Sequence, residues 1–219
     1  MRTRLVLVLT AVATVSFRVL PSSAPAQTVT PKPATPAPAA TPKKVDRADP
    51  KAVVQAFGAA IATGDRATAR SLTFGTARQL EYVEAMIDDY QAIIRFDKAL
   101  KSKFGRDAND YLDYYERYHE FSKKAEIELD GDEATATFEV LDKDEEIWDL
   151  VKRNGQWGLD ADQFWDPEEE PESSPEQLRK STKAIDDITL KMTAGAYAKV
   201  DDAIDAFDET QDLSQFKKD

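Results

Sequence analysis

The chain has 219 residues, with 41 acidic and 29 basic side chains, a formal net charge of -12 and no cysteine. The lack of cysteine excludes disulfides, thiol catalysis and zinc-thiolate sites. The negative charge disfavours binding to nucleic acid or to anionic lipid headgroups, so we expect partners that are cationic, neutral or proteinaceous.

The first 26 residues have the three parts of a secretory signal peptide. Met1–Arg4 is basic, Leu5–Phe17 is apolar, and Ala24–Ala26 offers a small-residue cleavage site. The apolar run is shorter than the roughly 20 residues that span a bilayer. We therefore predict cleavage after Ala26 and a soluble product in the periplasm or the extracellular space, with no membrane attachment. A retained amphipathic anchor is the alternative.

Residues 27–48 predict a disordered linker rich in Pro, Thr and Ala. The stretch TVTPKPATPAPAATPKK contains five prolines and no large apolar side chain apart from Val29. Such a composition favours an extended tether that has nothing to bury. A wall-spanning or glycosylated stalk is the functional alternative to a plain spacer.

Helical spacing of apolar residues dominates the stretch that follows, up to residue 122. The expected helices cover residues 50–63, 65–72, 76–102 and 109–122. Asp49 can cap the first helix, Gly64 can end it, and Thr76–Gln79 fits a capping box for the third. Arg95, Lys98, Lys101 and Lys103 crowd the end of the third helix, where positive charge offsets the exposed carbonyl groups. A ligand-binding basic patch is the alternative role for them.

From residue 125 the apolar period shortens to two. Alternation predicts strands over residues 125–129, 134–140, 147–151 and 156–161. Gly-Asp and Asn-Gly pairs at 131–132 and 154–155 supply tight turns between them. Trp148 and Trp157 would then lie on facing strands or on the same sheet face. The pattern indicates an antiparallel meander with one solvated face.

An acidic, proline-containing linker is expected at residues 164–174, and a helical hairpin at residues 175–216. The predicted fold class is therefore α+β. N-terminal helices pack on a curved antiparallel sheet of about four strands, forming a cone-like domain over residues 49–163, and a C-terminal helical hairpin follows.

Three phrases resemble the nuclear-transport-factor-two-like superfamily, including its polyketide-cyclase-like and lumazine-binding-like secreted members. They are DPKAVVQAFGAAIATGDRATARSL, GDEATATFEV and IWDLVKRNGQWGLD. The resemblance implies an opening helical hairpin, a sheet strand and a closing hairpin, and it covers residues 49–163. The helical stretch 76–122 is longer than in that family, and residues 174–216 lie outside the resemblance. The family hosts isomerases, dehydratases and binding modules, so it implies no single activity.

The candidate site residues are few. His119 is the single histidine, so any imidazole chemistry must use it, and a partly exposed helix residue is its alternative role. A pocket for a flat apolar ligand would be lined by Tyr111, Tyr115, Tyr118, Trp148 and Trp157, with simple core packing as the alternative. The acidic turns lack the spacing of a calcium loop, and phosphate-loop, nucleophile-elbow and zinc patterns are missing. We therefore expect no metal and no cofactor.

Two functions remain open. The first is an exported, non-catalytic module that binds a protein or a small apolar ligand. The second is a cofactor-free isomerase or cyclase, with Asp142 or Asp149 as base and Tyr115 or His119 as hydrogen-bond donor. An apolar cavity with converging polar groups between sheet and helices would favour the enzyme. A filled interior would favour the binding module.

Overall fold

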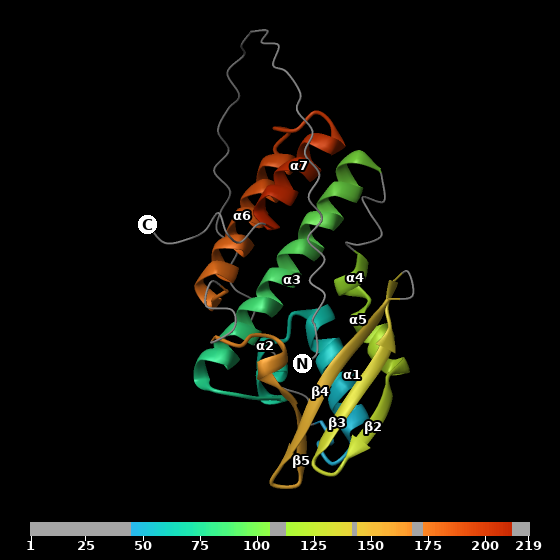
Figure 1. Cartoon of the computed structure of the whole chain (residues 1–219). Coiled ribbons are helices and arrows are strands. Elements are labelled where there is room, and N and C mark those ends of the chain that lie inside the picture. Colours follow the sequence, from blue (N-terminus) through green and yellow to red (C-terminus); the bar gives the residue numbers. More distant parts are fainter. Residues whose placement is uncertain (1–44, 106–112, 142–143, 168–172, 212–219) are drawn as a thin grey trace, which may run out of the picture. The chain divides into compact units, whose positions relative to one another are not determined.

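The computed structural model describes residues 45–105, 113–141, 144–167 and 173–211 (Figure 1). Its α-helices are α1 (Pro50–Thr63), α2 (Arg66–Ser71), α3 (Ala77–Phe104), α4 (Asp113–Glu116), α5 (Tyr118–Phe121), α6 (Pro175–Thr193) and α7 (Val200–Gln211). Its strands are β1 (Thr73–Phe74), β2 (Glu126–Asp130), β3 (Glu133–Glu139), β4 (Glu145–Arg153) and β5 (Gln156–Asp160). The predicted signal peptide and most of the predicted linker lie outside the described residues.

The first helices begin and end at the residues that the sequence indicated. The Asp49 side chain accepts a hydrogen bond from the backbone N–H of Lys51, and Gly64 ends α1 with a φ of 72°. Thr76 and Gln79 form the capping box of α3, which Gly105 ends with a φ of 63°. Local capping chemistry therefore fixes these boundaries.

The prediction of one continuous aromatic helix over residues 109–122 is wrong for the residues that the structure describes. Two one-turn helices, α4 and α5, take its place. Arg117 lies between them with φ -92° and ψ -1° and makes no side-chain cap. The packing partner of this region is α1, where Gly58 allows a close approach. A Cβ atom at Gly58 would lie 2.2 Å from the Ser122 Oγ and 2.9 Å from the Tyr118 carbonyl oxygen. Tertiary contact with α1 outweighs the helical periodicity here.

The sheet has five strands within the described residues, in the order β1-β5-β4-β3-β2. The four-stranded antiparallel meander is confirmed, and Asn154 and Gly155 form its last turn with φ values of 54° and 75°. The prediction missed β1, which pairs parallel to β5 and makes the sheet mixed. Two residues are too few to show a periodicity, so the pairing of Thr73 and Phe74 left no signal in the sequence.

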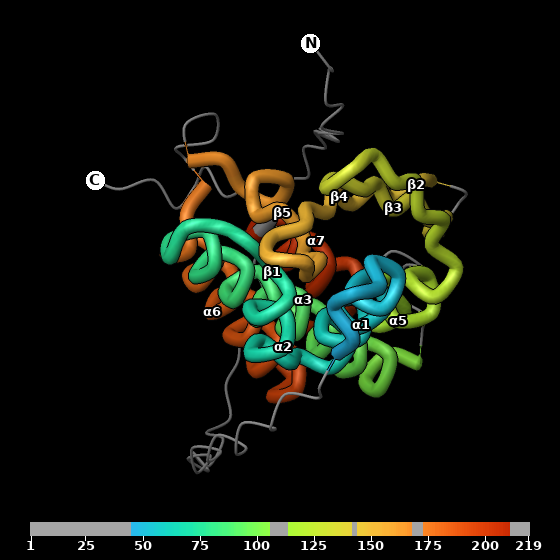
Figure 2. The backbone as a smooth tube through the Cα atoms, turned by 90° about the horizontal axis from the view of Figure 1, so that it is seen from below, coloured from blue at the N-terminus to red at the C-terminus, as the bar shows by residue number. Residues whose placement is uncertain are grey.

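One hydrophobic cluster joins the sheet to the helices beside it. Figure 2 shows α1 and α5 on one side of β2, β3 and β4, and α1 contacts β2, β3 and β5. Phe57 of α1 and Trp148 of β4 belong to this cluster, with side chains 0% and 3% exposed. The apolar positions of the predicted alternation therefore face the helices.

A second hydrophobic cluster attaches the C-terminal hairpin to the last half of α3. Helix α6 packs along α3 (Figure 1), and α7 packs on α6. Phe96 of α3 stacks on Phe207 of α7 with ring centroids 4.6 Å apart. The Arg95 guanidinium contacts both carboxylate oxygens of Asp186, at 2.8 and 3.0 Å. This basic side chain therefore serves helix packing.

The fold extends beyond both predicted ends of the domain. Arg47, placed in the predicted linker, donates from Nε to the Trp157 carbonyl at 2.9 Å and from Nη1 to the Ser71 carbonyl at 2.8 Å. Trp165, placed in the predicted acidic linker, is 5% exposed and stacks on Tyr82 at 5.1 Å. Both segments thus carry side chains that contact the folded domain, and Trp165 is part of its core.

Candidate functional site

A polar cluster lies where α4 and α5 meet β4. Residues two apart in a strand share a face, so Glu146 lies on the helix-facing side with Trp148. The Glu146 carboxylate accepts from the Tyr114 hydroxyl at 3.1 Å and from Trp148 Nε1 at 3.3 Å. The Tyr118 hydroxyl is 3.0 Å from the Tyr114 oxygen and 3.4 Å from Glu146. Because a phenol has one proton, the shorter contact gives the chain Tyr118 to Tyr114 to Glu146.

The tyrosines of this cluster are neutral hydrogen-bond donors. Burial, with the nearby Glu146 charge as a further cause, raises the pKa values of Tyr114 and Tyr118 above the usual phenol range. Glu146 is half-buried, and its carboxylate has donors on both oxygens. The arrangement holds a carboxylate in a fixed orientation among aromatic rings.

Aromatic rings pack against one another between α1 and the sheet beside this cluster. Trp148 makes T-shaped contacts with Phe57 at 5.2 Å and with Phe138 at 4.8 Å, and it stacks on Tyr118 at 5.8 Å. Phe164 also stacks on Phe57, at 5.3 Å. These separations are those of directly packed rings, so the predicted pocket residues Tyr118 and Trp148 pack against each other.

Among the remaining predicted residues, Tyr115 adjoins the cluster, with its ring centroid 5.3 Å from that of Tyr114 and 6.1 Å from that of Tyr118. Burial raises the pKa of Tyr115, with the Asp89 and Glu146 charges as further causes. Tyr115 stacks on Tyr90 at 4.1 Å, and Trp157 is buried on the same sheet face as Trp148 but next to Lys152, whose Nζ is 5.4 Å from the ring centroid. The Nδ1 atom of His119, a half-buried residue, is 3.1 Å from the Glu116 carbonyl oxygen.

Asp149 does not fulfil the condition set for a catalytic base. It is exposed, one residue out of phase with Trp148, and therefore points to the opposite sheet face. Tyr111 and Asp142 lie outside the described residues. The sequence analysis did not single out Glu146. Its spacing of two and four residues from Trp148 and Leu150 indicates that it shares their face of the strand.

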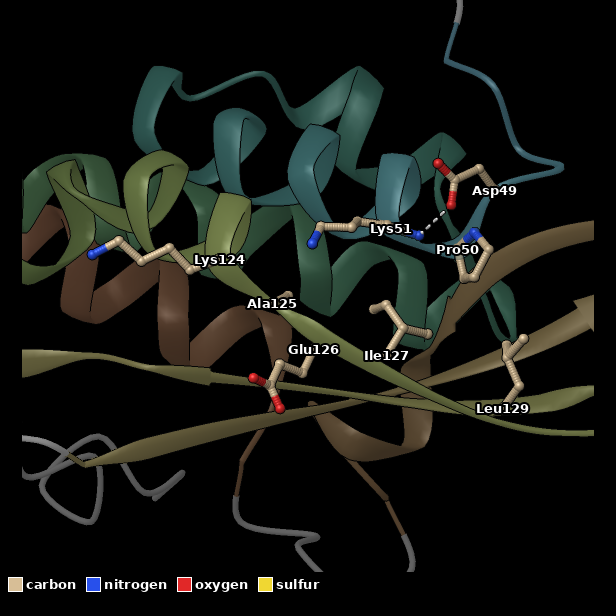
Figure 3. Close-up of a pocket in the computed structure, with 8 residues that line it drawn as sticks. All are labelled: Asp49, Pro50, Lys51, Lys124, Ala125, Glu126, Ile127 and Leu129. Atoms are coloured by element: carbon tan, nitrogen blue, oxygen red, sulfur yellow. Dashed lines mark hydrogen bonds between the residues drawn. The ribbon is translucent and has the colours of Figure 1, made fainter.

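A groove lies between the start of α1 and the outer strand β2 (Figure 3). Its volume is about 520 Å³, and it is open to solvent. The lining residues are Asp49, Pro50, Lys51, Lys124, Ala125, Glu126, Ile127 and Leu129. Leu129 is 62% exposed, which is high for a large apolar side chain. Within the described residues, neither Lys51 nor Lys124 forms an ion pair.

Residues 45–105, 113–141, 144–167 and 173–211 contain no group of three or more His, Asp or Glu side chains placed to hold a metal ion. In the same part of the chain, every helix is too short or too polar to cross a bilayer. No protein-family model, no curated protein and no solved structure is significantly similar to the chain.

Proposed function

We propose that this chain is an exported, non-catalytic module that binds another protein. The observation that carries the proposal is the packing of Phe57, Phe138, Tyr118 and Trp148 between α1 and the sheet. In a cone-like fold this is the place where a substrate cavity would lie. Because these described rings pack directly on one another, we place the partner on the outer surface of the described residues.

The groove beside β2 is the surface that suits a partner best. It combines an exposed apolar side chain, Leu129, with charged groups at its rim, which is the composition expected of a protein-binding surface. Export is supported by the basic start, the apolar run and the small-residue site before Gln27. The likeness to the nuclear-transport-factor-two-like superfamily is part of the same proposal and rests on the three sequence phrases alone.

A cofactor-free enzyme is the second candidate, and Glu146 is the observation that favours it. This carboxylate, held by Tyr114 and Trp148, would replace Asp149 as the base. Each of its oxygens accepts one hydrogen bond and keeps a second lone pair for a substrate proton, so this role requires a substrate that reaches Glu146 beside the aromatic rings. The binding module requires no such access and is therefore our first candidate.

Photo-crosslinking tests the binding proposal in the producing cell. A photoreactive phenylalanine analogue replaces Leu129 in the full-length chain, and the matched control carries it at Leu190, which is 60% exposed on α6. We expect a discrete adduct of higher mass from the Leu129 position and none from the Leu190 position. Equal adducts at both positions, or none at Leu129, would contradict the proposal.

A further inference from the structure

Strand β2 is a free edge of the sheet within the described residues, because it pairs with β3 alone. Gly131 and Asp132 form a two-residue loop, so the flanking pair Asp130 and Glu133 is hydrogen-bonded in both directions. Alternate residues of an antiparallel strand direct their N–H and C=O groups away from the partner strand. In β2 these residues are Ile127 and Leu129.

The side chains of the same two residues lie toward the groove. Ile127 is opposite Ala136 and Leu129 is opposite Ala134, and both alanines are buried on the helix-facing side of β3. Backbone groups without a partner strand and apolar side chains thus occur together at the same positions. This is the arrangement that an added strand recognises through its backbone and alternate side chains.

The opposite face of β2 is acidic. Glu126, Glu128 and Asp130 alternate with Ile127 and Leu129 and are all exposed, and Glu126, at the start of the strand, also borders the groove. The neighbouring strands add Glu133, Glu139, Glu145 and Asp149 to the exposed residues of that face. An added strand would place its own alternate side chains next to this acidic row, where opposite charges attract.

We propose that β2 accepts an extended segment of a partner protein as a sixth strand, with apolar residues toward the groove and Lys or Arg on the outer face. The proposal rests on the proposed function and names its surface and partner chemistry. The groove is lined by two basic and two acidic residues, so its apolar side chains rather than a net charge favour apolar residues on the inner side. The two faces of β2 therefore select opposite side-chain types at alternate positions.

Two other occupants fit this surface less well. A second copy of the chain, pairing β2 with β2, would set Glu126, Glu128 and Asp130 against the same acidic row. The chain's own segment 28–44 has five prolines, which lack the N–H group that a ladder requires. The carboxylates thus act as edge protection against self-association while leaving the edge open to a basic strand.

Peptide titration followed by amide NMR of the full chain tests the proposal. The probe is a blocked hexapeptide of sequence KVKLKV, compared with the charge-reversed EVELEV and with VVLKKK, which has the same composition without alternation. We expect KVKLKV to shift the amide signals of Ile127 and Leu129 and to slow their hydrogen exchange. Equal binding of either control peptide, or shifts confined to other strands, would overturn the proposal.

Three protein variants sharpen the same titration. Glu128→Lys should weaken KVKLKV binding about three- to tenfold, because one cross-strand attraction becomes a repulsion. Leu129→Lys should weaken KVKLKV binding by a similar factor, because it removes an apolar contact on the groove side of β2. Leu190→Lys should leave KVKLKV binding unchanged. All three positions are exposed, and thermal melts confirm that each variant is folded. Unchanged binding in Glu128→Lys and Leu129→Lys would overturn the proposal.

The peptide and crosslinking results separate the two proposals. A specific adduct at Leu129 without binding of KVKLKV would leave the groove as a protein-binding site and refute strand addition. Binding of KVKLKV with no adduct in the producing cell would place a strand on β2 and refute the proposed cellular role.

Discussion

Glu146 and Trp148 share one face of β4, and the indole Nε1–H of Trp148 donates to Glu146 Oε1 at 3.3 Å. Trp148 is 3% exposed, and its ring packs directly on Phe57, Phe138 and Tyr118. A carboxylate is thereby tied to the side chain at the centre of the core. The stability of the domain and the orientation of its best candidate site residue are thus linked.

Replacing Glu146 by Ala should lower the free energy of unfolding by about 1–3 kcal/mol, because hydroxyl and indole donors lose their acceptor. Urea denaturation measures the change. Glu145→Ala is the matched control, since Glu145 is the exposed neighbour and should change stability by less than about 0.5 kcal/mol. Equal effects of the two variants would show that the cluster is not structural.

Asp89 should make stability depend on pH. It is 7% exposed, and burial raises its pKa to about 6. Hydrogen bonds from Thr182 and Ser181 oppose this shift, while the charges of Asp186 and Asp88 add to it. A raised pKa means that the folded state holds the proton more tightly than the unfolded chain. The stabilising contribution is therefore complete below pH 4 and lost as the pH rises through 6.

The variant Asp89→Asn isolates this effect. At pH 7 it should be more stable than the parent chain by up to about 3 kcal/mol, and the difference should vanish near pH 4. Urea denaturation at several pH values measures both curves. Parallel curves across this range would show that Asp89 does not titrate with a raised pKa.

Gly58→Ala should destabilise the fold by about 1–3 kcal/mol, although alanine favours helix more than glycine does. The added Cβ would meet the Ser122 Oγ at 2.2 Å and the Tyr118 carbonyl oxygen at 2.9 Å. The double variant with Ser122→Gly should recover part of the loss in thermal melts. A stabilised Gly58→Ala variant would mean that α1 and α5 separate at low cost.

Arg47→Lys should destabilise the chain by about 1–2 kcal/mol, although the charge is kept. The guanidinium donates to two carbonyl groups and lies 4.7 Å from the centre of the Phe74 ring. A lysine ammonium cannot reproduce this planar, forked contact. Arg66→Lys is the control, because Arg66 forms one exposed ion pair, with Asp88. Equal melting temperatures for the two variants would refute a structural role for Arg47.

If the chain is exported, its mature form should have one defined N-terminal residue. Cleavage after Ala26 should give a chain that begins at Gln27 and carries a net charge of about -15, since Arg2, Arg4 and Arg18 are removed. Intact-mass spectrometry of protein from the medium or the periplasm measures this. A chain that keeps its first 26 residues would contradict the signal peptide.

The sequence predicted most of the sheet because each strand carries its own alternation. The same alternation could have located Glu146, which shares the parity of Trp148, and could have set aside Asp149, which does not. The encounter of Tyr114 with Glu146 joins residues 32 positions apart and depends on where α4 packs. No local pattern records such a contact.

Other features also depend on contacts across the chain. The pairing of β1 with β5 and the contact of Arg47 with Trp157 are formed between distant segments. The break at Arg117 follows from the closeness of α1, which helix periodicity does not encode. Capping residues and turn residues act locally, and this is why the ends of α1 and α3 and the turn at Asn154 were predictable.

Helix α3 gives its first turns to the cluster beneath the sheet and its last turns to the cluster beneath α6 and α7. An isolated half-helix of about 14 residues is marginal in water, so neither half persists unaided. Unfolding of the α6–α7 hairpin would expose Phe96 and Leu100 to solvent and destabilise the C-terminal half of α3. The loss of helix would extend toward Tyr90, which stacks on Tyr115 and packs against both clusters. One continuous helix thus makes the two clusters melt in concert.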